Sequence, residues 1–384
     1  MDLWLLSLVL LSISIGWILA RWRLFRKKKT NNQVENCSDS FAQGLNYLLS
    51  DDSENAIKVF TKIIDVNPNT IEVHLSLGNL FRSKGEVDRA IKVHQNLLAR
   101  PDLNRKQRNF VIEELANDYL KAGLLDRAEK LFKELIQLNN SNLVAYRHLL
   151  DLYIAAKSWD EAVDCAQVLF DRKYVDASTS LSQCLCEAAE KAVRKGNRKK
   201  ARHCLMKALE VDESCVRAAL LLIQWYLNAQ DNSAAKKVFK RLVKKSPEYM
   251  ELYIEPAKNI FLRGKQSAKY QIFLQQQYSR QPSTRLAIAL LEHYETTNKP
   301  EKAREFLFEV LAKTPSFGAY DFALRFLRSD AIQLTNTLYG LSNFLKTMQE
   351  KKAEFVCTQC GYESHAIQWS CPSCRNWSSM KSVM

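Results

Sequence analysis

Four cysteines near the C-terminus of this 384-residue chain have the spacing of metal ligands. Cys357 and Cys360 form one C-x-x-C pair, and Cys371 and Cys374 form a second pair after ten intervening residues. Two such pairs place four thiolates tetrahedrally around one ion, and thiolate ligands suit zinc or iron. Gly361 follows the first pair, where a tight turn favours a residue without Cβ. The sequence therefore predicts one metal ion held by these four cysteines.

The chemistry of this predicted site depends on the identity of the metal. Four thiolates close the coordination sphere, which argues against hydrolytic chemistry because no position is left for water. Zinc would make the site structural, whereas iron would make it redox-capable. His365 is not expected to be a ligand, since the tetrad is complete without it. A domain this small, with Tyr362, Trp369 and Trp377 as its sizeable apolar residues, depends on its metal to fold.

The rest of the sequence carries no motif for catalysis. It contains no phosphate-cradling glycine loop, no nucleophile elbow and no H-E-x-x-H pattern. Six further cysteines show no paired framework, which is typical of a chain in a reducing compartment. These are Cys37, Cys165, Cys184, Cys186, Cys204 and Cys215. We therefore expect a protein that is not an enzyme.

The elements that precede the cysteines are predicted to be paired helices. Glycine and proline are scarce, with 10 and 8 residues, which fits long helices better than a loop-rich β protein. A small residue recurs at steps of 34, 38 or 39 residues, and twice 34 at the end: Ala56, Ala90, Ala128, Ala162, Ala201, Ala235 and Ala303. Small or apolar residues recur twelve positions earlier, and aromatic residues nine positions earlier. This is the tetratricopeptide pattern, in which two helices approach closely at the small residues.

The predicted fold is therefore an all-α, right-handed superhelix of stacked helix pairs. Eight units fit between residues 37 and 317, and a further helix pair at about 317–349 would cap them. The seventh unit, Met250 to Ser283, is the poorest match because the period places Lys269 at the position of the small residue. His74 and His94 fall at interior positions, where packing is a better interpretation than ligand binding.

Polar residues on the first helix of early units are candidates for binding a partner. By helical position we expect the groove to contain Asn79, Arg82, Asn117, Lys121 and Asp151. Amides and cations there would hold a peptide backbone or an acidic tail. The alternative, that they are ordinary solvated residues, stays open, because the same scaffold binds many unrelated peptides.

An apolar run from Leu3 to Ala20 predicts a transmembrane helix. Its eighteen uncharged residues extend roughly 27 Å as a helix, close to the roughly 30 Å of a bilayer core. Positive charges follow the run at Arg21, Arg23, Arg26, Lys27, Lys28 and Lys29. By the positive-inside rule the N-terminus lies outside and the bulk of the chain in the cytoplasm. The alternative of a buried core helix is disfavoured by this basic run, which is also a candidate for binding acidic headgroups.

The net charge of +14 would permit nucleic-acid binding on composition alone. However, six of the positive charges belong to the stretch after the apolar run. The tail from Lys351 to Met384 holds four Lys or Arg residues against two Glu, which is too little to follow a phosphate backbone. We therefore expect no nucleic-acid partner.

The order of these parts resembles that of a known family. The stretch HLSLGNLFRSKGEVDRAIKVHQNLL, from His74 to Leu98, and the tail CTQCGYES…WSCPSCRNWS closely resemble the lipopolysaccharide assembly protein B family of Gram-negative bacteria. The resemblance implies a bacterial inner-membrane adaptor with a periplasmic N-terminus and a rubredoxin-like tail. It implies that the adaptor promotes degradation of the deacetylase LpxC by the membrane protease FtsH and meets other envelope-biogenesis proteins. It also favours iron as the bound metal.

Two alternatives remain beside this interpretation. In the first, the chain is a scaffold that co-localises lipopolysaccharide synthesis and transport enzymes at the cytoplasmic face of the inner membrane. In the second, it is an electron carrier. Rubredoxin has glycine after both cysteine pairs, whereas Arg375 stands here after the second pair, which disfavours electron transfer. Whether the chain forms a homo-oligomer is left open.

We expect four segments: an anchor at 1–20, a basic juxtamembrane linker at 21–36, the repeat array at 37–350 and the metal-binding domain at 351–384.

Overall fold

The computed structural model describes residues 42–44, 46–47, 50, 52–66, 71–313, 316–327 and 353–382. The predicted transmembrane helix, the basic residues after it and most of the predicted capping pair lie outside these ranges. Within the described residues, no helix has the length and apolarity needed to cross a membrane. The chain divides into two compact units, residues 1–152 and 153–384, each of which is described by itself.

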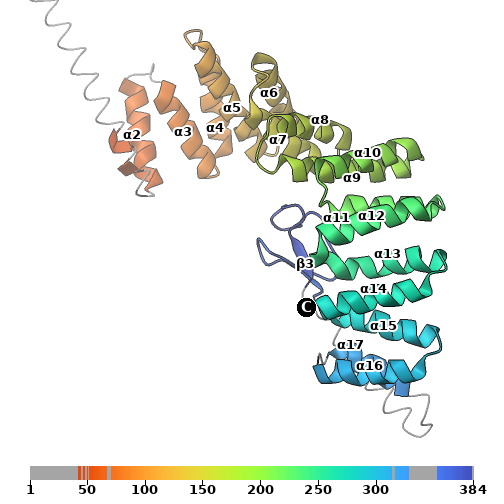
Figure 1. Cartoon of the computed structure of the whole chain (residues 1–384). Coiled ribbons are helices and arrows are strands. Elements are labelled where there is room, and N and C mark those ends of the chain that lie inside the picture. The colour runs from red at the N-terminus through yellow and green to blue at the C-terminus, as the bar shows by residue number, and fades with distance from the viewer. Residues whose placement is uncertain are drawn as a thin grey trace, which may run out of the picture. The chain divides into compact units, whose positions relative to one another are not determined.

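Helices in consecutive pairs build both units (Figure 1). The first unit contains α2 (Ser53–Val66), α3 (Ile71–Ser83), α4 (Val87–Leu98), α5 (Arg105–Lys121), α6 (Leu125–Leu138) and most of α7 (Leu143–Ala155). The second unit contains α8 (Trp159–Asp171), α9 (Ala177–Arg194), α10 (Arg198–Val211), α11 (Val216–Asn228), α12 (Asn232–Lys245), the short 3-10 helix η1 (Pro247–Tyr249), α13 (Met250–Arg263), α14 (Ser267–Arg280), α15 (Thr284–Thr296), α16 (Pro300–Lys313) and α17 (Phe317–Leu327).

The recurring small residue has one structural position throughout the repeats. Wherever it occurs, it is the fourth residue of the second helix of a pair, as at Ala90 in α4 and Ala128 in α6, and every one of the seven alanines is fully buried. Close helix approach explains the preference. A Cβ atom at Gly78 of α3 would lie 2.3 Å from the Nε2 atom of His94 in α4, so only glycine fits there. The sequence period therefore marks where two helices touch.

The seventh unit departs from this period, and the position assigned to Lys269 was wrong. Lys269 is exposed, and the fourth residue of α14 is Tyr270, which is 2% exposed. The shift arises because α13 has 14 residues where α11 has 13, so α14 begins one residue later than the period requires. The Tyr270 ring packs edge-on against His293 of α15, at 5.2 Å between centroids. A large aromatic residue thus fills the position that alanine holds elsewhere.

From α3 to α16, tight turns with one left-handed residue connect the two helices of each pair. Glycine occupies this position in three pairs, at Gly85, Gly123 and Gly196. In the other pairs a residue with a side chain adopts the same positive φ: Lys157, Gln230, Lys265 and Asn298. Each of these residues lies two positions before the next helix begins. The turn therefore survives without glycine, although L-residues are strained in this conformation.

A small antiparallel sheet forms the C-terminal domain, which we call the knuckle (residues 353–382). Its strands are β1 (Phe355–Cys357), β2 (Glu363–Ser364) and β3 (Met380–Ser382), in the order β2-β1-β3. Phe355, Cys357, Cys371 and Met380 form its core, and Leu252 of α13 packs against them. The knuckle lies beside α11 and α13 (Figure 1). Its core is therefore continuous with a repeat helix.

Candidate metal centre and partner-binding surface

The four predicted cysteine ligands meet at one point of the knuckle. Their Sγ atoms all lie within 4.8 Å of one another. The Sγ atoms of Cys357 and Cys374 are 3.7 Å apart, and those of Cys360 and Cys371 are 3.6 Å apart. Four sulfur atoms about 2.3 Å from a central ion form a tetrahedron with edges of roughly 3.8 Å. The cluster therefore has the dimensions of a four-coordinate metal site, and its thiolates fit iron and zinc equally.

Both C-x-x-C pairs end in the same turn. The Gly361 amide donates to the Cys357 carbonyl at 2.9 Å, and the Arg375 amide donates to the Cys371 carbonyl at the same distance. Both residues are left-handed, with φ of +74° at Gly361 and +59° at Arg375. Arg375 thus adopts the backbone that glycine provides at the first pair. The missing second glycine does not alter the geometry of the sulfur cage, although the turn there is strained.

The thiols of the cluster differ in their affinity for protons. The hydrogen bond with the Ser379 hydroxyl, at 3.2 Å from Sγ, is the main cause that lowers the pKa of Cys357 to about 6. At Cys374 the Asn376 amide favours the thiolate, but burial and the neighbouring thiols together raise its pKa to about 11. Because a metal requires four thiolates, its binding releases the remaining protons. Metal affinity at this site therefore falls as the pH falls.

Side chains from the repeat helices hold the knuckle in place. Gln183 of α9 is 1% exposed, and its Nε2 atom donates to the Ser378 hydroxyl at 3.1 Å. The Ser382 hydroxyl donates to Glu251 of α13 at 2.9 Å. The knuckle is therefore anchored to the first helices of separate pairs.

Charged groups add contacts at the edge of this interface. Arg285 of α15 forms an ion pair with Glu354, just before β1. The Lys381 ammonium group lies 5.0 Å from the centre of the Tyr249 ring, a cation–π distance. Glu354 and Lys381 are exposed and Arg285 and Tyr249 are half-buried, so water screens both contacts and their individual contributions are small. Together with Gln183 they fix which helices the knuckle touches.

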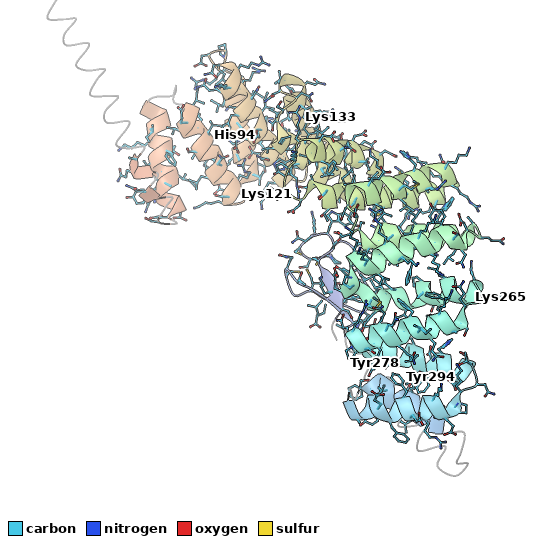
Figure 2. All side chains as sticks on the ribbon, viewed as in Figure 1. His94, Lys121, Lys133, Lys265, Tyr278 and Tyr294 are labelled. Atoms are coloured by element: carbon cyan, nitrogen blue, oxygen red, sulfur yellow. The ribbon has the colours of Figure 1, made fainter. Side chains whose placement is uncertain are left out.

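Four of the five predicted groove residues lie together in the first unit. Asn79, Arg82, Asn117 and Lys121 line a cavity of about 530 Å³ that also includes Leu120. Lys121 is exposed and lies at the surface of this unit, whereas His94 lies among its helices (Figure 2). The predicted polar residues of α3 and α5 thus share one surface.

A buried network fixes the arrangement of this surface. Arg82 donates to Glu114 at 2.6 Å, to Asp118 at 2.8 Å and to the side-chain oxygen of Asn79 at 2.8 Å. Asp118 and His94 are both fully buried, and the His94 Nδ1 atom lies 2.5 Å from the Asp118 carboxylate. The charge of Arg82 is therefore neutralised inside the protein. Because the Asn79 oxygen accepts from Arg82, its amide nitrogen remains as a donor.

The remaining predicted site residues lie elsewhere. Asp151 of α7 is exposed, pairs with Arg147 at 3.3 Å and is not among the residues that line this cavity. The six basic residues predicted at the membrane surface lie outside the described residues. His365 is exposed, and the cluster of four cysteines forms without it.

Sequence reasoning missed the residues that attach the knuckle to the repeats. Gln183 belongs to a helix of mainly small, thiol and apolar residues, and a lone amide on such a buried face is the available signal. Glu251 and Arg285 carry no comparable signal, since charged residues are common on exposed helix faces. Their partners lie in a different domain and follow no period.

Sequence comparisons identify helical repeats and a metal-binding domain in this chain. A model described as a rubredoxin metal binding domain matches residues 355–382, and tetratricopeptide repeat models match residues 73–107, 113–170 and 186–251. Lipopolysaccharide assembly protein B of Escherichia coli (strain K12) is 27% identical over 99% of this chain and 97% of its own. The protein of the same name from Haemophilus influenzae is 30% identical over 99% of this chain and 98% of its own.

The chain belongs to the lipopolysaccharide assembly protein B family. The similarity extends over nearly the full length of both relatives. A chain of the Naa15/Naa10 complex bound to HypK-THB has a TM-score of 0.50 and 15% identity over 82% of this chain and 47% of its own. That likeness concerns the helical-repeat fold alone. The four cysteines lie within the matched rubredoxin metal binding domain and are arranged so that they could hold one metal ion.

Proposed function

We propose that this protein is a non-catalytic inner-membrane adaptor that restrains lipopolysaccharide synthesis by promoting degradation of the deacetylase LpxC by the protease FtsH. Its family supports a role in lipopolysaccharide assembly, and the tetratricopeptide repeats support binding of other proteins. The predicted helix at residues 1–20 would anchor it as a single-pass protein with a periplasmic N-terminus. The anchor would raise its effective concentration near membrane-bound partners.

The observation that carries this proposal is the polar cavity of the first unit. Asn79 and Asn117 contribute amides, and Lys121 contributes a cation, around a surface of α3 and α5. Arg82 does not contribute charge there, because Glu114 and Asp118 neutralise it. Amide and ammonium donors suit an extended peptide with acidic side chains. We propose this surface as the place where a protein partner is held.

The metal has a supporting role in this proposal. Bound to Cys357, Cys360, Cys371 and Cys374, an iron or zinc ion would fold the knuckle and keep it attached to α9 and α13. Family resemblance favours iron. The closed thiolate shell supports a structural function for the ion.

The lifetime of LpxC in cells that contain FtsH tests the proposal. We expect a longer lifetime when this protein is depleted, and the same effect when Lys121→Glu replaces it at equal abundance. Lys130→Glu on α6 is the matched control, because Lys130 is exposed and lies outside the cavity. An unchanged LpxC lifetime on depletion would reject the adaptor role and favour the scaffold that co-localises synthesis and transport enzymes.

A further inference from the structure

A second cavity, in the second unit, lies between repeat helices and the knuckle. Its volume is about 350 Å³, and α9, α11 and α13 each contribute to its lining. Trp369 of the knuckle also lines it. The wall formed by Trp369 comes from the loop between the two cysteine pairs, two residues before Cys371. The shape of the cavity therefore depends on the folded knuckle.

Seven of the twelve residues that line this cavity are apolar, and several of them are incompletely covered. Leu220 and Leu221 of α11, Leu252 and Pro256 of α13, and Trp369 are each half-buried, so their apolar surfaces remain partly in contact with water. Covering such surface is favourable in proportion to its area. A tryptophan beside leucines in a concave site is also typical of positions that dominate peptide binding. The cavity is therefore suited to one bulky apolar side chain.

Carboxylates outnumber cations around the cavity. Glu190 and Glu255 line it, and Glu187 forms an ion pair with Arg217, which also lines it. Arg217 donates to Glu187 at 2.9 Å and to Glu190 at 2.8 Å, so its positive charge is already offset. Glu255 is exposed, and its carboxylate accepts a hydrogen bond from the neutral amide of Asn259 at 3.4 Å. The rim therefore favours a ligand that carries positive charge.

Arg217 is held inside the wall of this cavity. It is 6% exposed, and its Nε and Nη1 atoms have no hydrogen-bond acceptor among the described residues. Buried donors without acceptors are costly and rare in folded proteins. Both nitrogen atoms are enclosed by the protein itself and present no surface to a ligand in the cavity.

We propose that this cavity binds a peptide segment of a partner protein in which a bulky apolar residue is flanked by Lys or Arg. The apolar side chain fills the space between Leu221, Leu252 and Trp369, and the flanking cation meets Glu190 or Glu255. Because Trp369 forms one wall, binding requires the metal-loaded knuckle. This site differs from the polar cavity of the first unit and stands whether or not the partner is LpxC.

Fluorescence anisotropy with three labelled peptides tests the proposal on the full-length, metal-loaded protein. The peptides share a Ser-Gly frame around Lys-Leu-Phe-Lys, Glu-Leu-Phe-Glu or Lys-Ser-Ser-Lys. We expect saturable binding of the first peptide, and binding of the other two that is weaker by about tenfold or more. Removing the metal with a chelator should weaken binding of the first peptide by a similar factor. Circular dichroism checks that the repeats stay helical after this treatment.

Variants identify the site. Trp369→Ala, Leu221→Asp and Glu255→Lys should each weaken binding of the Lys-Leu-Phe-Lys peptide by about tenfold. Ile272→Asp on α14 and Glu301→Lys on α16 are matched controls, since both residues are exposed and lie outside the cavity. Leu221→Asp and Glu255→Lys keep the test valid if Trp369→Ala unfolds the knuckle. Equal binding of all three peptides, no binding of any, or unchanged binding by the metal-free protein or by both repeat variants would overturn the proposal.

Discussion

At the scale of single residues, the buried carboxylate of Asp118 stabilises the first unit by binding both Arg82 and His94. In Asp118→Ala, Arg82 keeps its ion pair with Glu114, whereas the buried His94 ring loses the carboxylate beside its Nδ1 atom. Leaving a buried polar group without its hydrogen-bond partner costs about 1–3 kcal/mol. We expect a matching loss in the free energy of unfolding measured with urea. Asp151→Ala removes an exposed carboxylate and should change it by less than about 0.5 kcal/mol; equal losses in both variants would contradict the network.

His148 makes the first unit sensitive to acid. Its ring stacks on Phe132 at 4.8 Å, and burial lowers its pKa below the ordinary 6.5, although Asp151 and Glu113 oppose the shift. A lowered pKa means that the unfolded chain takes up a proton more readily than the folded one. Stability from this residue is therefore present above pH 6.5 and is lost as the pH falls through the lowered pKa. His148→Phe keeps the stacking and should reduce the loss of urea stability between about pH 7.5 and pH 5.5. Identical pH profiles for both proteins would refute this.

At the scale of elements, the left-handed turn residues offer a way to stabilise the repeats. Lys157 has φ of +55° at the turn position that glycine occupies in three other pairs. Lys157→Gly relieves strain of about 1–2 kcal/mol but loosens the unfolded chain, so a net gain of about 0.5 kcal/mol is expected. Lys130→Gly, inside α6, is the opposite case and should cost about 1 kcal/mol. The two urea midpoints should move in opposite directions; a decrease for both would show that the turn is not strained.

The helix pairs could be predicted from the sequence wherever the same packing recurs along the chain. Ala90, Ala128 and their equivalents each mark the fourth residue of a second helix, because the same close approach recurs in every pair. The period failed at α14, where one extra residue in α13 shifts Tyr270 into the buried position. A single insertion keeps the helix pair intact and is therefore invisible to a rule based on spacing alone.

The metal cluster was predictable for a different reason. In proteins, four thiols with this spacing commonly bind one metal ion. Cys357 and its three partners could therefore be predicted as ligands without knowledge of the fold. The docking of the knuckle was not predictable. Contacts such as Gln183 to Ser378 join residues far apart in sequence, and polar side chains of this kind occur on many helix surfaces.

At the scale of the whole molecule, the metal should control whether the knuckle stays on the repeats. Cys371→Ser removes a fully buried ligand, so we expect loss of the ion and unfolding of the tail while the helices remain. Limited proteolysis should then cleave within residues 353–382, and circular dichroism should retain its helical signal. His365→Ala should keep the metal and the resistance to protease, since His365 is exposed and outside the cluster. A protected tail in the Cys371→Ser protein would show that docking does not need the ion.

The contacts of the knuckle have a mechanical consequence for the second unit. A solenoid normally behaves as an elastic spring, because each repeat touches only its neighbours and small changes add up along the array. Here Gln183 of α9, Glu251 of α13 and Arg285 of α15 are all tied to one rigid body. A rigid domain attached to several helices limits how far these repeats stretch or bend under an applied force. Loss of the ion would then make this part of the array more flexible even though no helix unfolds.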